Sequence, residues 1–293
     1  MSRRHSPATG KRYPLRVVCA VWQVPRSSVY ATAAGNAGTA GAKRGPKTAQ
    51  SDADVVTLIR AVLAASPFHS EGHRKVRVRL RQHGVHAGKA RVLRLMRVHG
   101  LLAPSRAGHP HGDPAHPGRI TTDRPDELWG TDATCFWTAR DGWCWFFGAI
   151  DHGTDEVVGW KATKRGDRWA ALEPIHQGVR YAFGGFHKDI ARGLTVRSDW
   201  GPQYTAHAFG AELRWLGIQH SPSFVGEPQC NGVIERFMRT LKEQCLWLHR
   251  FTDLAHAERE IAAFIERYNQ EWLVERHGHC TPREVRAKMR AAA

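Results

Sequence analysis

Acidic residues are scarce in the first 120 residues of this 293-residue chain. That stretch has 4 Asp/Glu and 21 Lys/Arg, whereas the remainder has 23 and 22. The net charge of +16 therefore comes from the N-terminal part alone. Tuning for solubility would explain a basic protein, but not a basic half. The distribution indicates a nucleic-acid-binding region joined to a nearly neutral body.

Other absences narrow the class of protein. There is no run of 18 apolar residues, and residues 1–30 lack the apolar core of a signal peptide, so we expect no membrane span and no secretion. The six cysteines are scattered without a CxxC pair, which argues against a disulfide framework. His277-Gly278-His279-Cys280 lacks a second ligand pair at zinc-finger spacing. We expect a cytoplasmic protein in a reducing compartment.

Apolar periodicity and the Gly/Pro-rich stretches divide the chain into several parts. Residues 14–30 predict two short helices, for which a helix-turn-helix and a plain helical hairpin fit equally well; Ser27 or Ser28 can cap the second. The expected parts are a short N-terminal helical pair at 1–30, a linker at 31–50, a helical DNA-binding domain at 51–102, a linker at 103–122, a core at 123–250 and a helical tail at 251–293.

Within the basic region we expect three helices, at 52–65, 73–82 and 88–99. The third has an apolar face, and Arg91, Arg94 and Arg97 form a row on the opposite side. That pattern is typical of a recognition helix seated in a DNA groove. A solvated basic face on an ordinary helical bundle is the alternative.

The remainder of the chain predicts strands followed by alternating helices. We expect strands at 128–137, 143–151, 156–163, 194–197 and 217–220, helices at 167–183, 205–216 and 231–248, and a mobile loop at 222–230. This order predicts an α/β fold with a mixed five-stranded sheet and flanking helices.

Three acidic residues fall at positions that can converge at one edge of such a sheet. Asp132 lies in the middle of the first strand, Asp199 follows the fourth, and Glu235 lies in the first turn of the last helix, with 35 residues between the last two. Carboxylates on separate elements can hold two hard divalent cations, which can clamp the attacking and leaving oxygens of a phosphodiester. Asp151 is a rival acid, but we interpret it as a turn residue beside Thr154-Asp155.

Several strings together resemble a known family. They are Glu71-Gly72-His73-Arg74-Lys75-Val76, Arg91 through Arg97, Trp129-Gly130-Thr131-Asp132, Ser198-Asp199-Trp200-Gly201-Pro202-Gln203-Tyr204, Asn231 through Glu235 with Leu241-Lys242-Glu243, Tyr268-Asn269 and Thr281-Pro282. In this combination and order the chain resembles the DDE transposase and retroviral integrase superfamily. It is most similar to the second-reading-frame, OrfB-type product of insertion sequence family 3 elements.

The resemblance implies an RNase H-like core preceded by small all-α, helix-turn-helix-like DNA-binding units. It implies a transposase that cleaves at element ends and transfers a 3′-hydroxyl to a new phosphodiester. Asp132, Asp199 and Glu235 would be its catalytic residues and would hold Mg²⁺ or Mn²⁺, two ions in all. The implied partners are DNA, further copies of the chain on DNA, and an upstream-frame helix-turn-helix partner or fusion. The implied setting is the bacterial nucleoid.

Further basic residues are candidate DNA contacts. Arg239 and Lys242 share a helix face with Glu235, at spacings that suit phosphate binding beside the metals. An ordinary ion pair between Glu235 and Arg239 is the alternative. Lys75 joins Arg91, Arg94 and Arg97 as a candidate in the helical unit, and Asn231 is a good helix N-cap.

Two other functions remain open. A structure-specific nuclease could use the same core, although the basic N-terminal units favour an enzyme that reads sequence. A DNA-binding regulator with an inactive core would be expected to have lost a carboxylate, and all three are present.

Overall fold

The computed structural model describes residues 4–35, 50–104, 122–222 and 231–292. The chain divides into two units, Met1–Ser51 and Asp52–Ala293. Most of the predicted linkers at 31–50 and 103–122, and of the predicted loop at 222–230, lies outside the described residues. No helix in the described ranges has both the length and the apolar character to cross a membrane.

The first unit contains two short helices, α1 (Leu15–Val21) and α2 (Arg26–Gly35). The expected cap at Ser27 or Ser28 is wrong, because the helix already begins at Arg26 and both serines lie inside it. Cys19 is buried, but Val21 and Trp22 are 75% and 61% exposed, so the apolar side chains at the end of α1 lie largely in solvent.

The second unit begins with the three predicted helices, α3 (Asp52–Ala65), α4 (His73–Gln82) and α5 (Lys89–Val98). They enclose a small core of Val55, Val56, Ile59, Val62, Val76, Leu80, Val85, Ala87, Val92, Leu95 and Met96. Gly84 and Gly100 follow α4 and α5 with positive φ, where glycine ends a helix without steric cost. Phe68, in the loop after α3, packs edge-on against Trp272 with ring centroids 4.9 Å apart.

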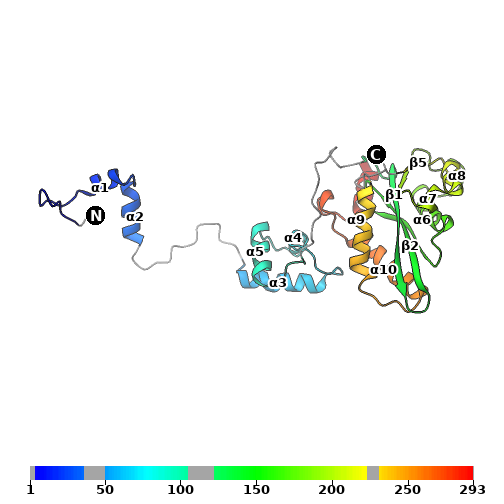
Figure 1. The fold of residues 1–293 in the computed structure, drawn as a ribbon, viewed down its shortest axis with the longest axis horizontal. Coiled ribbons are helices and arrows are strands. Elements are labelled where there is room, and N and C mark those ends of the chain that lie inside the picture. The colour runs from blue at the N-terminus through cyan, green and yellow to red at the C-terminus, as the bar shows by residue number, and fades with distance from the viewer. Residues whose placement is uncertain (1–3, 36–49, 105–121, 223–230, 293) are drawn as a thin grey trace. The chain divides into compact units, whose positions relative to one another are not determined.

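A five-stranded mixed sheet forms the centre of this unit (Figure 1). Its strands are β1 (Leu128–Thr138), β2 (Gly142–Asp151), β3 (Val157–Thr163), β4 (Thr195–Ser198) and β5 (Gln219–Pro222). The order is β3-β2-β1-β4-β5; β1, β2 and β3 pair antiparallel, while β4 lies parallel to β1 and β5 parallel to β4. The sheet predicted from the sequence is confirmed.

Helices cover both faces of the sheet (Figure 1). One face carries α6 (Arg168–Phe183), α7 (Pro202–Thr205) and α8 (His207–Trp215), and the other carries α9 (Gly232–Leu241), a π-helical turn (Lys242–Leu246) and α10 (Leu254–Glu271). Asp167 caps α6 by accepting hydrogen bonds from the N–H groups of Trp169 and Ala170. A Cβ on Gly159 of β3 would overlap the Pro174 carbonyl oxygen, so glycine allows α6 to pack this closely.

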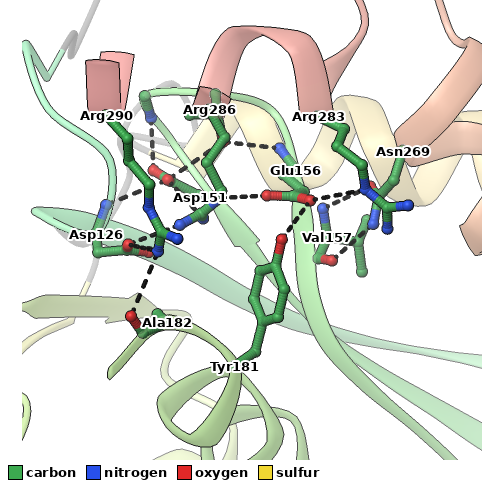
Figure 2. Close-up of polar contacts among 12 residues, drawn as sticks. Asp126, Asp151, Glu156, Val157, Tyr181, Ala182, Asn269, Arg283, Arg286 and Arg290 are labelled. Carbon is green, nitrogen blue, oxygen red and sulfur yellow. Dashed lines mark hydrogen bonds and ion pairs between the residues drawn. The ribbon is translucent and has the colours of Figure 1, made fainter. Parts of the chain in front are cut away.

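The chain ends in a 3₁₀ turn (Glu275–His277) and the helix α11 (Pro282–Ala292), which contributes a buried arginine. Figure 2 shows Arg286 among three carboxylates: it donates to Asp126 at 2.6 Å, to Asp151 at 3.0 Å and to Glu156. The Arg286 side chain is 3% exposed. Because the acids precede β1, end β2 and precede β3, one guanidinium ties the C-terminal helix to three strand ends.

The hairpin between β2 and β3 confirms the turn interpretation of Asp151. Its carboxylate accepts from the Gly153 N–H at 2.8 Å and from the Thr154 hydroxyl at 3.2 Å. Burial raises the pKa of Asp151 to about 6, against the opposing effect of Arg286. The bond to Arg286 was not expected from the sequence, since 134 residues separate the two.

Replacement of Arg286 by leucine should destabilise the protein severely. It leaves three carboxylates without their shared cation, and breaking a buried ion pair costs about 3–5 kcal/mol. The matched variant Arg290→Leu, on the same helix but 47% exposed and 3.4 Å from Asp126, should cost at most about 1 kcal/mol. Urea unfolding measures both; equal losses would contradict the role given to Arg286.

Candidate functional site

Asp132 lies in the middle of β1, on the sheet face that α9 covers. Phe136, four residues further along the same strand, packs in the core that α9 contributes to, and residues at even spacing share a face. Across the sheet Asp132 pairs with Gly148, which has no side chain to cover the carboxylate. One carboxylate oxygen, Oδ1, accepts from the Ala133 N–H at 2.7 Å.

Asp199 and Glu235 approach this position from β4 and α9. Asp199 follows the last residue of β4, the strand next to β1, and its Oδ1 accepts from the Gly201 N–H at 2.9 Å. Glu235 occupies the first turn of α9. The opposite side of that helix, including Ile234, Phe237 and Leu241, is buried against the sheet.

Asp132 lies close enough to Asp199 and Glu235 for their charges to act on its ionisation. Burial, and then the nearby charges of Asp199 and Glu235, raise the pKa of Asp132 to about 6, against the Ala133 N–H and Lys242. Desolvation also raises the pKa of Glu235. Tyr204 is fully buried close to Asp132 and Asp199, and burial raises the pKa of its hydroxyl well above the usual value. Of the three acids, Asp132 is the half-buried one, whereas Asp199 and Glu235 are exposed.

The chemistry of these donors fits a hard divalent cation. All three side chains offer carboxylate oxygens, which Mg²⁺ and Mn²⁺ prefer, and a cation would offset the repulsion that raises the pKa of Asp132. Within the described ranges, no three His, Cys, Asp or Glu side chains already stand as a ready-made metal site. Asp199 and Glu235 are close enough to raise the pKa of Asp132, but the three carboxylates are not gathered around one point in the described structure.

The basic residues predicted on the last helix occupy different surroundings. Lys242 lies close enough to Asp132 and Cys135 to lower the pKa of both groups, although burial dominates each shift. Arg239 donates to Glu243 at 2.9 Å, one turn further on, so the ion pair of this arginine is not with Glu235. Of the two, Lys242 is the cation next to the carboxylates.

The arginine row of α5 faces the start of α3. Arg91 and Arg94 donate to the two carboxylate oxygens of Asp52, at 2.8 and 2.7 Å, while Arg97 is exposed. Lys75 lies elsewhere, with its ammonium nitrogen 2.9 Å from the ring centroid of Trp272. The structure thus brings Arg91 and Arg94 together on Asp52, while Arg97 is exposed at the end of α5 and Lys75 lies against Trp272.

Two buried residues next to Gly130 of β1 were missed or underestimated from the sequence. Asn231 does occupy the N-cap position of α9, but its side chain makes no cap bond and donates instead to the Thr131 carbonyl at 3.4 Å. His152 is 2% exposed; burial, then Arg197 and Arg276, lower its pKa to about 4, against the Asn231 side chain. The spacing of Asn231 one turn before Glu235 was a usable signal, whereas nothing in the sequence singled out His152.

Comparison with protein families gives three matches that together span most of the chain. Two models described as integrase core domain match residues 122–228 and 216–282. A model described as HTH-like domain matches residues 50–109.

Individual relatives are bacterial insertion-element proteins. The chain is 27% identical over 238 residues to the insertion element IS407 uncharacterized 31.7 kDa protein of Burkholderia multivorans, covering 81% of this chain and 83% of the relative. It is 28% identical over 240 residues to transposase InsD for insertion element IS2A/D/F/H/I/K of Escherichia coli, covering 80% of this chain and 78% of the relative.

Among solved structures, one match is a chain of the simian T-cell lymphotropic virus intasome in complex with PP2A regulatory subunit B56 gamma. The TM-score is 0.48 at 16% identity, and the match covers 80% of this chain and 74% of that one.

Stability should fall in mild acid because of His152. With a folded-state pKa of about 4, the folded chain stays unprotonated while the unfolded chain binds a proton below about pH 6.5. The free energy of unfolding should therefore drop by about 2 kcal/mol between pH 7.5 and 5 through this group alone. Urea unfolding of wild type and His152→Phe at both pH values tests this; the same pH dependence in both proteins would contradict it.

Proposed function

We propose that this chain, which belongs to the integrase-core transposases of insertion sequence family 3, cleaves DNA at the ends of its element and joins the 3′-hydroxyl to target DNA. The observation that carries the proposal is the effect of two nearby carboxylates on a third. Asp132, in the centre of the sheet, has its pKa raised by burial and by Asp199 and Glu235. A site of that kind suits cation-assisted phosphodiester chemistry.

The three carboxylates would hold Mg²⁺ or Mn²⁺, two ions in all. When bound, such ions activate the attacking oxygen and offset charge on the leaving oxygen. The protein's part is to fix its ligands. Asp132 is fixed by the strand and the Ala133 N–H, Asp199 by the Gly201 N–H, and Glu235 by the buried side of α9.

Lys242 would bind a DNA phosphate beside the carboxylates. It acts on the ionisation of Asp132, and an ammonium is a suitable point charge for a phosphate oxygen. Arg239, which bonds Glu243 in the free protein, would exchange that partner for a phosphate. Such contacts position DNA without reading its sequence.

The helical unit would recognise the element ends. The match of residues 50–109 to an HTH-like domain and the arginines of α5 support this role. In the free protein Asp52 neutralises part of the row, so Arg91 and Arg94 would leave this carboxylate when they contact DNA. Lys75 would act less directly, because its ammonium lies against Trp272.

The proposed domain limits separate the two roles, DNA recognition and phosphodiester chemistry. Residues 51–102 would bind DNA and residues 123–250 would carry out the chemistry, preceded by the helical pair at 1–30 and followed by the helical tail at 251–293. Joining two ends in one reaction would require at least two copies on DNA. The chain would act with an upstream-frame helix-turn-helix partner or as a fusion with it. Its location would be the bacterial cytoplasm, at the nucleoid.

Neutralising any of the three carboxylates should abolish chemistry and leave DNA binding nearly intact. Asp132→Asn, Asp199→Asn and Glu235→Gln each remove a charge from the cation site while preserving shape. The measurement is cleavage and strand transfer with purified protein, Mg²⁺ and a labelled duplex ending in the element's terminal sequence.

Glu258→Gln is the matched control, since Glu258 lies on α10 and pairs with Lys161 at 3.4 Å. It should retain wild-type rates, and Mn²⁺ should replace Mg²⁺ in the wild type. Cleavage without a divalent cation, or an active Glu235→Gln protein, would refute the proposal.

Alanine variants in the arginine row should weaken binding to the element end unequally. Arg94→Ala and Arg97→Ala should have the larger effects, because these side chains are exposed and Arg91 is half-buried. Each lost phosphate contact should reduce the slope of log affinity against log salt by about 0.9, whereas a lost base contact should relax specificity at one base pair. Binding titrations at several salt concentrations measure both; three variants with wild-type binding would show that α5 is not the reading helix.

A further inference from the structure

The side chain of Asn231 links the start of α9 to β1. Its amide nitrogen donates to the Thr131 carbonyl at 3.4 Å, and the residue is 5% exposed. An asparagine at an N-cap ordinarily accepts from the N–H groups of the first turn, but this side chain makes no such bond. Its amide is used between elements, not within its own helix.

Gly130 leaves the space in which this link is made. A Cβ at Gly130 would stand only 2.7 Å from the amide oxygen of Asn231 and 2.7 Å from Nε2 of His152. Real Cβ atoms do not approach polar atoms so closely, so any side chain at residue 130 would displace the amide. Gly130, His152 and Asn231 are therefore in buried contact next to β1.

This contact lies close in sequence to Asp132 on the strand and to Glu235 on the helix. Thr131 directly precedes Asp132 in β1, and Asn231 precedes Glu235 by four residues, about one helical turn. A helix and a strand are both stiff over such lengths. Fixing the first residue of the helical turn against the strand therefore fixes Glu235 relative to Asp132.

We propose that Asn231 is a positioning residue, which sets the separation of Glu235 and Asp132 through its bond to the Thr131 carbonyl in the space left by Gly130. The inference rests on the proposed function, because it concerns the geometry of the carboxylate site. Asn231 itself would contact neither the cation nor the reacting atoms.

The variant Asn231→Ser separates this role from helix capping. Serine is as good an N-cap as asparagine but is too short to reach the Thr131 carbonyl. Loss of an outer partner of a metal ligand typically weakens metal affinity or activity by about 10–100-fold. We expect a loss of that size in Mn²⁺ affinity, measured by electron paramagnetic resonance without DNA, and in the turnover number for end cleavage. The affinity for the element end should be unchanged.

Asn269→Ser is a matched control for loss of a buried amide. Asn269 is 4% exposed, and its amide makes two 3.0 Å bonds to the Val157 N–H and carbonyl at the start of β3, as Figure 2 shows. This variant should lower the melting temperature at least as much as Asn231→Ser. Its Mn²⁺ affinity in the folded state should remain within about twofold of wild type, well short of the effect expected for an outer partner.

Gly130→Ala gives an independent test, because the added methyl group pushes the same amide from the strand side. It should reproduce the loss of Mn²⁺ affinity and turnover, and it replaces Asn231→Ser if that variant does not fold. Wild-type Mn²⁺ affinity and turnover in a folded Asn231→Ser or Gly130→Ala protein would overturn the inference alone. A wild-type chain without cation-dependent cleavage would overturn the proposed function, and this inference with it.

Discussion

The repulsion of a half-buried Asp132 by two nearby carboxylates is the constraint on which the arrangement of the sheet and α9 depends. Asp132 shows its cost directly, since burial and the two neighbouring acids raise its pKa to about 6. A flexible chain would relax that repulsion by moving the groups apart. Here the first two acids sit on or next to adjacent parallel strands, and the third on a helix whose opposite face is buried against the same sheet. The folding free energy of the two large cores therefore holds the acids in place.

Arg286 extends this principle to the far end of the chain. Three acids at strand ends share one buried guanidinium that comes from α11, beyond residue 282, where the integrase-core matches end. Buried ion pairs contribute little net stability compared with apolar packing, but removing one partner is costly. The network connects α11 to the ends of three strand segments. Through these bonds α11 is joined to the sheet, although the integrase-core match ends at its first residue.

The sequence pattern alone predicted the elements whose limits depend on residues close in sequence. The helices at 52–65 and 73–82 and the strands of the sheet follow the predicted ranges closely, because apolar period and glycine stops set their limits. Long-range side-chain partners could not be predicted in this way. Neither the bond of Asp151 to Arg286 nor that of Asn231 to the Thr131 carbonyl has a local signal. The acids themselves were recognisable by their order and spacing, whereas their distances depend on how the sheet and α9 pack.

The separation of charge along the chain is consistent with the proposed function. Acids that hold cations would repel the phosphates of DNA, so the region that carries them would not supply most of the affinity. Residues 121–293 are almost neutral, with 22 bases and 23 acids, and Lys242 is the cation that most directly offsets Asp132 there. The first 120 residues carry 21 bases, and all three carboxylates come after them in the sequence. Under the proposed function, phosphate attraction in that region would bring DNA to the protein without neutralising the acids that would hold metal.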